Sequence, residues 1–297
     1  MDSSSNPPSA AALNQESANK NSTMILSKRA SFFASYRRHQ NFSLPDSIMF
    51  YVSQNPTSSK VYEKMIQSCK YFFVKNPILV YSIFYLKYEN EWFTFFKRKP
   101  ADFKNLSCKI WITDGLSVYD RSLSTDKTFI SSIVPKVYQS DIKKFCLQNQ
   151  SISFNDFIFL TSKCETITFL DGISVKNEDC SIVPLEKLVE VLPKLTDLNC
   201  DLQNDPKLIT TKSVKELIGL SNFANLTRFI LFNIPDTFDI ETLYGYIKKN
   251  KKTEVHLFFS DQISAAYKNR LQTIKDAIVQ TENCDFIKPK IFFYGMH

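Results

Sequence analysis

A spaced apolar pattern recurs through the second half of the chain and constrains its fold more than any other feature. Two apolar residues separated by two others are followed, after one further residue, by a third. The four copies are Ile142-x-x-Phe145-x-Leu147, Cys164-x-x-Ile167-x-Phe169, Leu195-x-x-Leu198-x-Cys200 and Leu226-x-x-Phe229-x-Leu231. The last three begin at residues 164, 195 and 226, which are 31 residues apart, and the first precedes them by 22. A fixed period of this length is typical of repeat architectures.

Each copy ends in an alternation that indicates a short strand, because alternate side chains of a strand point to the same face. Ile110-x-Ile112 and Val255-x-Leu257 show the same alternation and extend the series at both ends. Between the copies, apolar residues recur every three or four positions, which predicts helices near residues 154–158, 185–192, 214–218 and 240–247. Pro184 and Asp239 are placed to begin two of these helices. Strands that alternate with helices predict an α/β fold.

This alternation resembles leucine-rich repeats, in which each copy supplies one strand of a curved sheet. The resemblance implies an irregular leucine-rich-repeat-like solenoid of alternating helices and strands over residues 81–297, with a target protein held on the sheet. The strand positions between the apolar ones would then carry the target-binding residues, for which we select Thr168, Asn199 and Ile230. The alternative is a compact α/β domain in which similar helix–strand units arise by chance.

A second feature lies upstream, in the segment that begins with Leu44–Pro45–Asp46. Proline is tolerated in the first turn of a helix, so this triplet predicts a helix start. After the break at Asn55–Pro56, apolar residues again recur at spacings of three to four, which predicts one helical face made of Val61, Met65, Cys69, Phe72 and Phe73. Ser58 or Ser59 is placed to cap that helix.

The order of a Leu-Pro pair, a short helix, a break and an apolar helix resembles an F-box, and more narrowly the divergent F-box-like proteins of nematodes. The resemblance covers residues 42–80 and implies docking to a Skp-type adaptor of a cullin-based ubiquitin ligase. By this resemblance, the residues expected to face the adaptor are Leu44, Pro45, Ile48, Met49, Val61, Met65 and Cys69. The alternative is two ordinary amphipathic helices that pack on their own domain.

The sequence offers little for catalysis. Glycine is scarce, at 5 of 297 residues, and neither a GxGxxG nor a GxxxxGK[ST] loop occurs, which excludes nucleotide-binding loops of those kinds. The three histidines, His39, His256 and His297, have no spacing typical of metal ligands, and no nucleophile elbow is present. His256 follows an alternation that turns it away from Val255 and Leu257, and its role as a general base stays open. We expect no enzyme, no catalytic residue, no cofactor and no metal.

Seven cysteines, an odd number without a CxxC pair, indicate reduced thiols in a protein of the cytoplasm or nucleus. Residues 1–41 begin with a polar stretch rich in Ser and Asn, contain more basic than acidic side chains, and are predicted to form a disordered basic tail without a secretory leader. The longest apolar run is too short to span a bilayer, so no membrane partner is expected.

Aromatic and basic side chains mix in residues 84–99, and the chain carries a net charge of +7. Such mixing can bind single-stranded nucleic acid by stacking, but aromatic residues are also the main core formers of a domain. Trp111 alternates with Ile110 and Ile112, which predicts a partly exposed indole.

Three functions therefore compete. The favoured one is a substrate receptor of a Skp–cullin–F-box ligase, with an unidentified target protein. The second is a protein-binding repeat domain without a ligase link, and the third, least favoured, is a nucleic-acid-binding protein.

Overall fold

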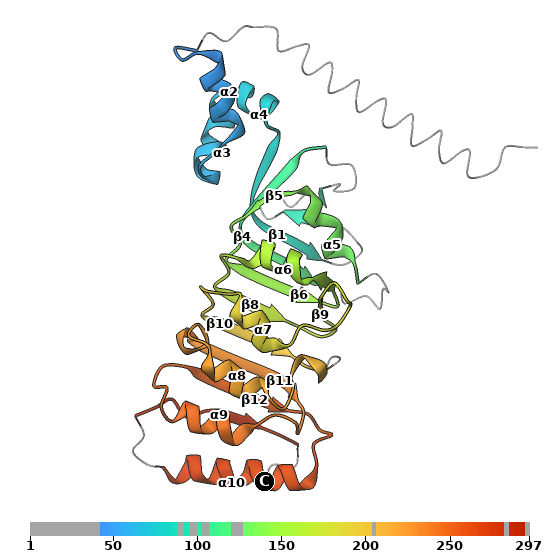
Figure 1. The fold of residues 1–297 in the computed structure, drawn as a ribbon, viewed down its shortest axis with the longest axis vertical. Coiled ribbons are helices and arrows are strands. Elements are labelled where there is room, and N and C mark those ends of the chain that lie inside the picture. The colour runs from blue at the N-terminus through green and yellow to red at the C-terminus, as the bar shows by residue number, and fades with distance from the viewer. Residues whose placement is uncertain are drawn as a thin grey trace, which may run out of the picture. The chain divides into compact units, whose positions relative to one another are not determined.

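A computed structural model describes the chain over residues 42–87, 92–94, 100–101, 107–119, 127–203, 206–281 and 285–294. These residues divide into two compact units, with the boundary between Pro77 and Ile78 (Figure 1). The predicted tail over residues 1–41 lies outside the described residues, as does most of the aromatic and basic region at 84–99.

The described part of the first unit contains three short helices, α2 (Asp46–Gln54), α3 (Ser59–Ser68) and α4 (Lys70–Lys75). Pro45 directly precedes α2, and its carbonyl accepts the first helical N–H groups. The predicted cap is confirmed at Ser58, whose Oγ accepts from the N–H of Val61 at 3.3 Å. The prediction of one continuous helix through Phe73 is wrong, because the backbone turns extended at Cys69, where φ is −151°. The Cys69 Sγ then accepts from the N–H of Tyr71 and begins α4.

The core of this unit is small and is closed by polar contacts. Met49, Cys69 and Phe72 form its buried centre. Side chains at the end of α2 and just after α4 tie those two helices together: the Asn76 amide donates to the Ser53 carbonyl at 3.0 Å, and the Gln54 amide donates to the Lys75 carbonyl at 2.8 Å. Such a core leaves much of α2 uncovered.

The second unit is built on one mostly parallel sheet, which confirms the predicted mixed α/β class. The order of its strands is β13-β12-β11-β10-β8-β6-β4-β1-β2-β3, with β5 beside β4, and only the β1–β2 and β2–β3 pairs are antiparallel. The bounds are β1 (Ile78–Lys87), β2 (Trp92–Thr94), β3 (Pro100–Ala101), β4 (Lys109–Tyr119), β5 (Val137–Ser140), β6 (Lys144–Gln148), β8 (Thr166–Phe169), β10 (Asp197–Asp201), β11 (Arg228–Ile234), β12 (Glu254–Phe259) and β13 (Lys290–Phe292).

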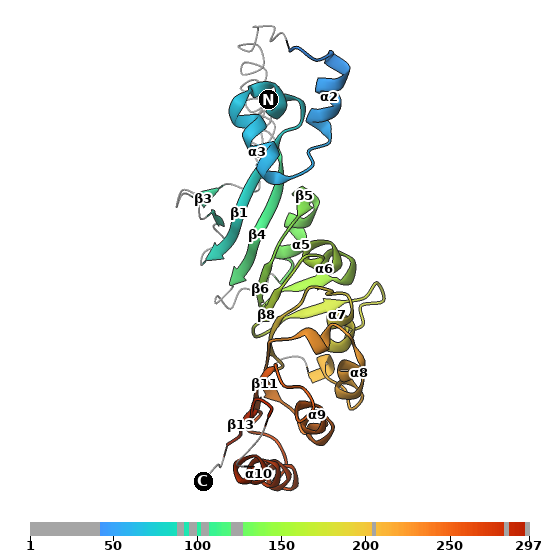
Figure 2. The same ribbon diagram turned by 90° about the vertical axis from the view of Figure 1, so that its left-hand side faces the viewer.

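Helices cover one face of this sheet, and within the described ranges none lies on the opposite face (Figure 2). They follow the strands as α5 (Phe129–Ile133), α6 (Phe154–Thr161), α7 (Leu185–Glu190), α8 (Ser213–Gly219), α9 (Ile240–Ile247) and α10 (Ala265–Gln280). Short 3-10 turns lie at η1 (Val134–Lys136), η2 (Pro206–Leu208) and η3 (Phe223–Asn225), and β7 (Ser151–Ser153) pairs with β9 (Ser174–Lys176) in a separate small sheet. We call the helix-free side of the large sheet the open face.

The recurring apolar pattern lines the core between the sheet and the helices. The first apolar residue of each copy precedes its strand and is buried, as are the two that follow within the strand. The residue that follows the first apolar position makes the same backbone contact in successive copies. The carbonyl of Lys143 accepts the N–H groups of the second and third residues of the next copy, and the carbonyls of Glu165 and Thr196 do the same for the copies after it. Successive copies are therefore held in one register.

Trp111 contradicts its prediction, because its side chain is fully buried. The indole packs against the ring of Tyr138, with the centroids 5.6 Å apart, and its Nε1–H donates to Asp141 Oδ2 at 2.6 Å. Asp141 also accepts from Gln139 and from Lys163. Although partial burial raises the pKa of Asp141, the hydrogen bonds from Lys163, Gln139 and Trp111 outweigh it and lower that pKa below its usual value.

We expect Asp141→Ala to destabilise the chain by about 1–3 kcal/mol, because the buried indole N–H loses its acceptor. Lys163→Ala removes only an exposed ion pair and should cost about 1 kcal/mol or less. Urea unfolding followed by circular dichroism measures both. Since the folded pKa is lowered, the contribution of Asp141 is present above the unfolded pKa of about 4 and is lost as the pH falls through the folded value. An equal cost for the two variants would contradict this role.

Candidate protein-binding surfaces

The first unit exposes a group of large apolar side chains. Leu44 is 52% exposed, Ile48 45% and Val61 46%, and two aromatic residues of α2, Phe50 and Tyr51, are exposed to a similar or greater degree. We call these five residues the outer apolar surface. Its α2 members lie on the side of the helix away from Met49, which points into the core. Four of the five lie on α2 or just before it, and Val61 lies on α3. A large exposed apolar patch is typical of an interaction site.

The residues expected to face an adaptor fall into two groups. Leu44, Pro45, Ile48 and Val61 are exposed, and Met65 is half-buried. Met49 and Cys69 lie instead in the core of the unit, where they support the surface from beneath and are not open to a partner in this arrangement. Phe50 and Tyr51 were not among the residues expected to face the adaptor, because they lie in an unbroken apolar run from Ile48 to Val52, in which helical spacing singles out no one face.

On the open face of the second unit, the residues expected to bind a target lie in one row. Asn199 pairs with Thr168 on one side and with Ile230 on the other. The row continues to Cys146 next to Thr168 and to His256 next to Ile230. Thr168, Asn199 and Ile230 are half-buried, since they stand on a sheet face that no helix covers.

A stack of three phenylalanines stands beside this row, nearer the carboxyl ends of the strands. The rings of Phe232 and Phe258 are 4.5 Å apart and inclined by 12°, and those of Phe258 and Phe292 are 4.6 Å apart and inclined by 8°. Phe292 is 38% exposed, and the other two are partly exposed. The alternation within the strands places them on the open face, but only the pairing of β11, β12 and β13 brings the three rings together. We call them the phenylalanine stack.

Charged side chains lie near the amino ends of β10, β11, β12 and β13, at the opposite end from the phenylalanine stack. Arg228 lies 3.7 Å from Asp197 and 3.9 Å from Glu254. Glu254 also accepts from His256 at 2.9 Å and contacts Lys290 at 3.4 Å. The hydrogen bonds from His256 and Lys290 lower the pKa of Glu254. His256 faces away from Val255 and Leu257, as predicted, and its ring contacts a carboxylate that would orient it for binding as readily as for proton transfer.

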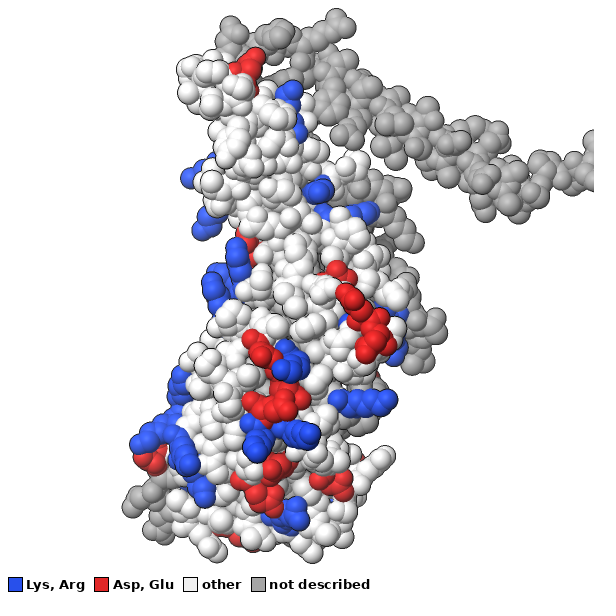
Figure 3. Space-filling view, viewed as in Figure 1, with Lys and Arg blue, Asp and Glu red and all other residues white. Residues whose placement is uncertain are grey.

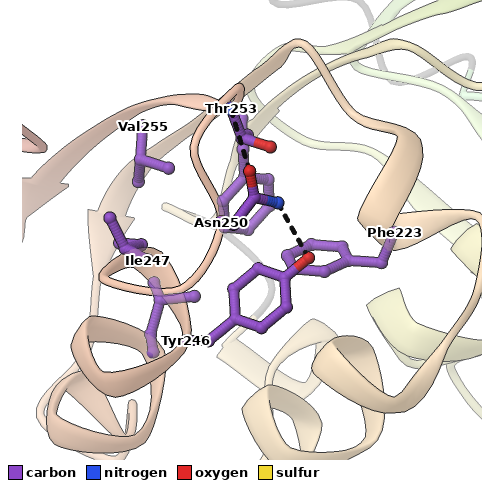
Figure 4. Close-up of a pocket in the computed structure, with 8 residues that line it drawn as sticks. Phe223, Tyr246, Ile247, Asn250, Thr253 and Val255 are labelled. Atoms are coloured by element: carbon purple, nitrogen blue, oxygen red, sulfur yellow. Dashed lines mark hydrogen bonds between the residues drawn. The ribbon is translucent and has the colours of Figure 1, made fainter. Parts of the chain in front are cut away.

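The second unit also contains a small void and an open pocket. One is a void of about 10 Å³ between α9 and the sheet, where the Asn250 side chain bridges Tyr246 and the backbone of Thr253 (Figure 4). That volume is about the least that a single water molecule needs, so this void is part of the packing. The other is an open pocket of about 420 Å³ at the carboxyl ends of β10, β11 and β12. Its size lies within the range of ligand sites.

The described residues contain no cluster of three or more His, Cys, Asp or Glu side chains that is arranged to hold a metal. Burial raises the pKa of the Cys164 thiol to about 12 and raises the pKa values of Cys146 and Cys200 as well, which opposes the thiolate form that a nucleophile needs. On the helix side of the second unit, positive and negative side chains are interspersed (Figure 3). Over the helices this mixture differs from the single-sign stripe typical of nucleic-acid binding, whereas Lys and Arg predominate along the left edge of the view.

Comparison with known proteins adds no relative. No protein-family model matches the chain, and no curated protein matches it significantly. Among the helices of the described ranges, none has the length and apolar character that crossing a membrane requires.

Thiol labelling tests the burial of the cysteines. At pH 8, we expect iodoacetamide to modify the exposed Cys180 within minutes, and Cys164 and Cys200 only after unfolding in urea. At a pKa of about 12, only about one Cys164 thiol in ten thousand is ionised at that pH. Peptide mapping by mass spectrometry reads out each site. Modification of Cys200 at the rate of Cys180 would mean that the core is open.

Proposed function

We propose that this protein is the substrate-recognition subunit of a Skp–cullin–F-box ubiquitin ligase. The helical first unit docks a Skp-type adaptor, and the open face of the second unit holds a target protein. The chain performs no chemistry itself. It acts by proximity. The second unit holds the target, the first unit binds the adaptor, and the adaptor recruits the ubiquitin-carrying enzyme, so that the enzyme and the target are brought together.

The observation that carries this proposal is the outer apolar surface. The described part of the first unit buries only four apolar residues, Met49, Tyr62, Cys69 and Phe72, and leaves Leu44, Ile48 and Val61 about half exposed, although their burial would be favourable. A partner that covers them removes that apolar area from water. Three of the four exposed residues that the resemblance assigns to adaptor contact belong to this surface, and Pro45 sits beside it at the start of α2.

Support for target binding comes from the open face. The sequential parallel strands place one position of every repeat copy in a row, as a leucine-rich-repeat-like solenoid does, and the row carries no covering helix. Within the described residues, the side-chain oxygen Oδ1 of Asn199 is buried and has no hydrogen-bond partner. A buried acceptor without a donor is costly, so a shift of the Asn199 side chain that lets a target's donor reach Oδ1 would be favourable.

A second function remains consistent with the same surfaces. The phenylalanine stack and the row through Asn199 suit protein binding whether or not an adaptor is recruited. A ligase-independent binding domain would keep its target after changes at Leu44 and Pro45. In that case the outer apolar surface would bind some other partner.

A pull-down with a purified Skp-type adaptor separates the two. We expect the full chain to retain the adaptor, and Leu44→Ala/Pro45→Ala to retain less. Ile48→Glu/Val61→Glu should abolish retention, because two charges placed in the contact must be desolvated. Glu side chains at exposed helix positions are tolerated in the free protein, so these variants stay folded.

Val279→Glu is the matched control, because Val279 is 69% exposed on α10 of the other unit. It should retain the adaptor like the unmodified chain. Absence of binding by the unmodified chain would reject the ligase function, and equal binding by Ile48→Glu/Val61→Glu would reject this docking site.

A further inference from the structure

We propose that the second unit selects target segments in which an arginine or lysine lies within a few residues of an aromatic or aliphatic side chain. The site consists of the open pocket at the carboxyl ends of β10–β12 together with the adjoining phenylalanine stack. This inference deepens the proposed target-binding role and rests on that part of the proposed function, but not on adaptor binding.

The pocket is polar and carries negative charge. Two carboxylates line it, Asp236 from the loop after β11 and Asp261 from the loop after β12. Its other polar members include Asn233, Ser260 and Gln262, and the apolar Ile263 forms part of its wall. No lysine or arginine is among the residues that line it. A volume of about 420 Å³ is ample for one long basic side chain.

Both carboxylates have acceptor capacity left. Asp236 accepts one long contact, from the N–H of Ser264 at 3.4 Å. Asp261 is exposed and makes no hydrogen bond or ion pair within the described part of the chain. By contrast, Asp201 on the neighbouring strand is engaged by the Asn233 amide at 2.7 Å and by the N–H of Gln203 at 3.0 Å. The two carboxylates that line the pocket are therefore less engaged than Asp201, and a guanidinium with its five donors is the best-matched cation for them.

Two rings of the phenylalanine stack lie on β11 and β12 just before the residues that line that pocket. Phe232 directly precedes Asn233, and Phe258 lies two residues before Ser260, so the pocket and the rings are separated by roughly 7 Å of extended strand. An extended target segment spans that distance with two residues. The apolar side chain of the target then covers the partly exposed rings, and its basic side chain enters the pocket. A guanidinium that passes the phenylalanine stack also gains a cation–π contact with the face of a ring.

Selection from a random twelve-residue peptide library displayed on phage tests the inference with the full chain. We expect at least tenfold enrichment of peptides in which Arg or Lys lies one to three residues from an aromatic or aliphatic residue. With Asp236→Asn/Asp261→Asn as the bait, the basic residues should lose their enrichment. With Phe258→Ser, the apolar preference should fall while the basic one stays.

The matched control is Glu190→Gln/Asp276→Asn, which removes the same two charges from exposed positions on α7 and α10. It should select the same peptides as the unmodified chain. Fluorescence anisotropy of the most enriched peptide should show at least tenfold weaker binding to the Asp236→Asn/Asp261→Asn variant and weaker binding at higher salt.

Two results overturn the inference: no enrichment of basic residues by the unmodified chain, or the same enrichment by the pocket variant. The adaptor pull-down with the pocket variant makes the two proposals distinguishable. Adaptor retention without peptide selection rejects the inference alone. Peptide selection without adaptor retention by any variant rejects the ligase link and leaves the inference standing.

Discussion

The second unit depends on the contact at the start of each strand, where one carbonyl accepts two consecutive N–H groups of the next copy. Lys143, Glu165 and Thr196 supply these carbonyls, and each follows the first apolar residue of its copy. The Thr196 and Thr227 hydroxyls add donors to the same carbonyl series, at 3.1 and 3.0 Å. This contact fixes the register, the register buries the three apolar positions of each copy, and the positions between them form rows on the open face. Both proposed binding features of the sheet follow from it.

The first unit obeys a different constraint, which is the size of its core. Three short helices bury too little apolar surface to hide every apolar side chain of α2. Met49 points inward, Ile48 is left outside, and so is Leu44 just before the helix. Polar contacts from Gln54 and Asn76 close the unit without using those residues. Because these side-chain amides donate to backbone carbonyls, the unit is closed without its exposed apolar residues, which stay free for a partner. The residues that stabilise this unit and the residues proposed to bind are therefore different sets.

Much of the second unit could be predicted from the sequence, because a one-sided apolar alternation reports the face that a strand buries. The strands predicted around Ile167, Leu198 and Phe229 all form, and Asp239 caps its helix as expected, with Oδ1 accepting from the N–H of Thr242 at 3.0 Å. Local pattern failed where a distant partner decides the outcome. Trp111 is buried because Asp141 and Tyr138 meet it, and the phenylalanine stack exists only through strand pairing. Helical spacing likewise did not reveal the break at Cys69.

Hydrogen–deuterium exchange of the full chain, with and without a purified Skp-type adaptor, tests the central claim most directly. We expect the adaptor to slow exchange in α2 and the first turn of α3, where the outer apolar surface lies, and to leave the exchange of β8, β10 and β11 unchanged. Protection confined to those strands, or no protection anywhere, would contradict the claim that the first unit binds the adaptor and the second unit binds the target.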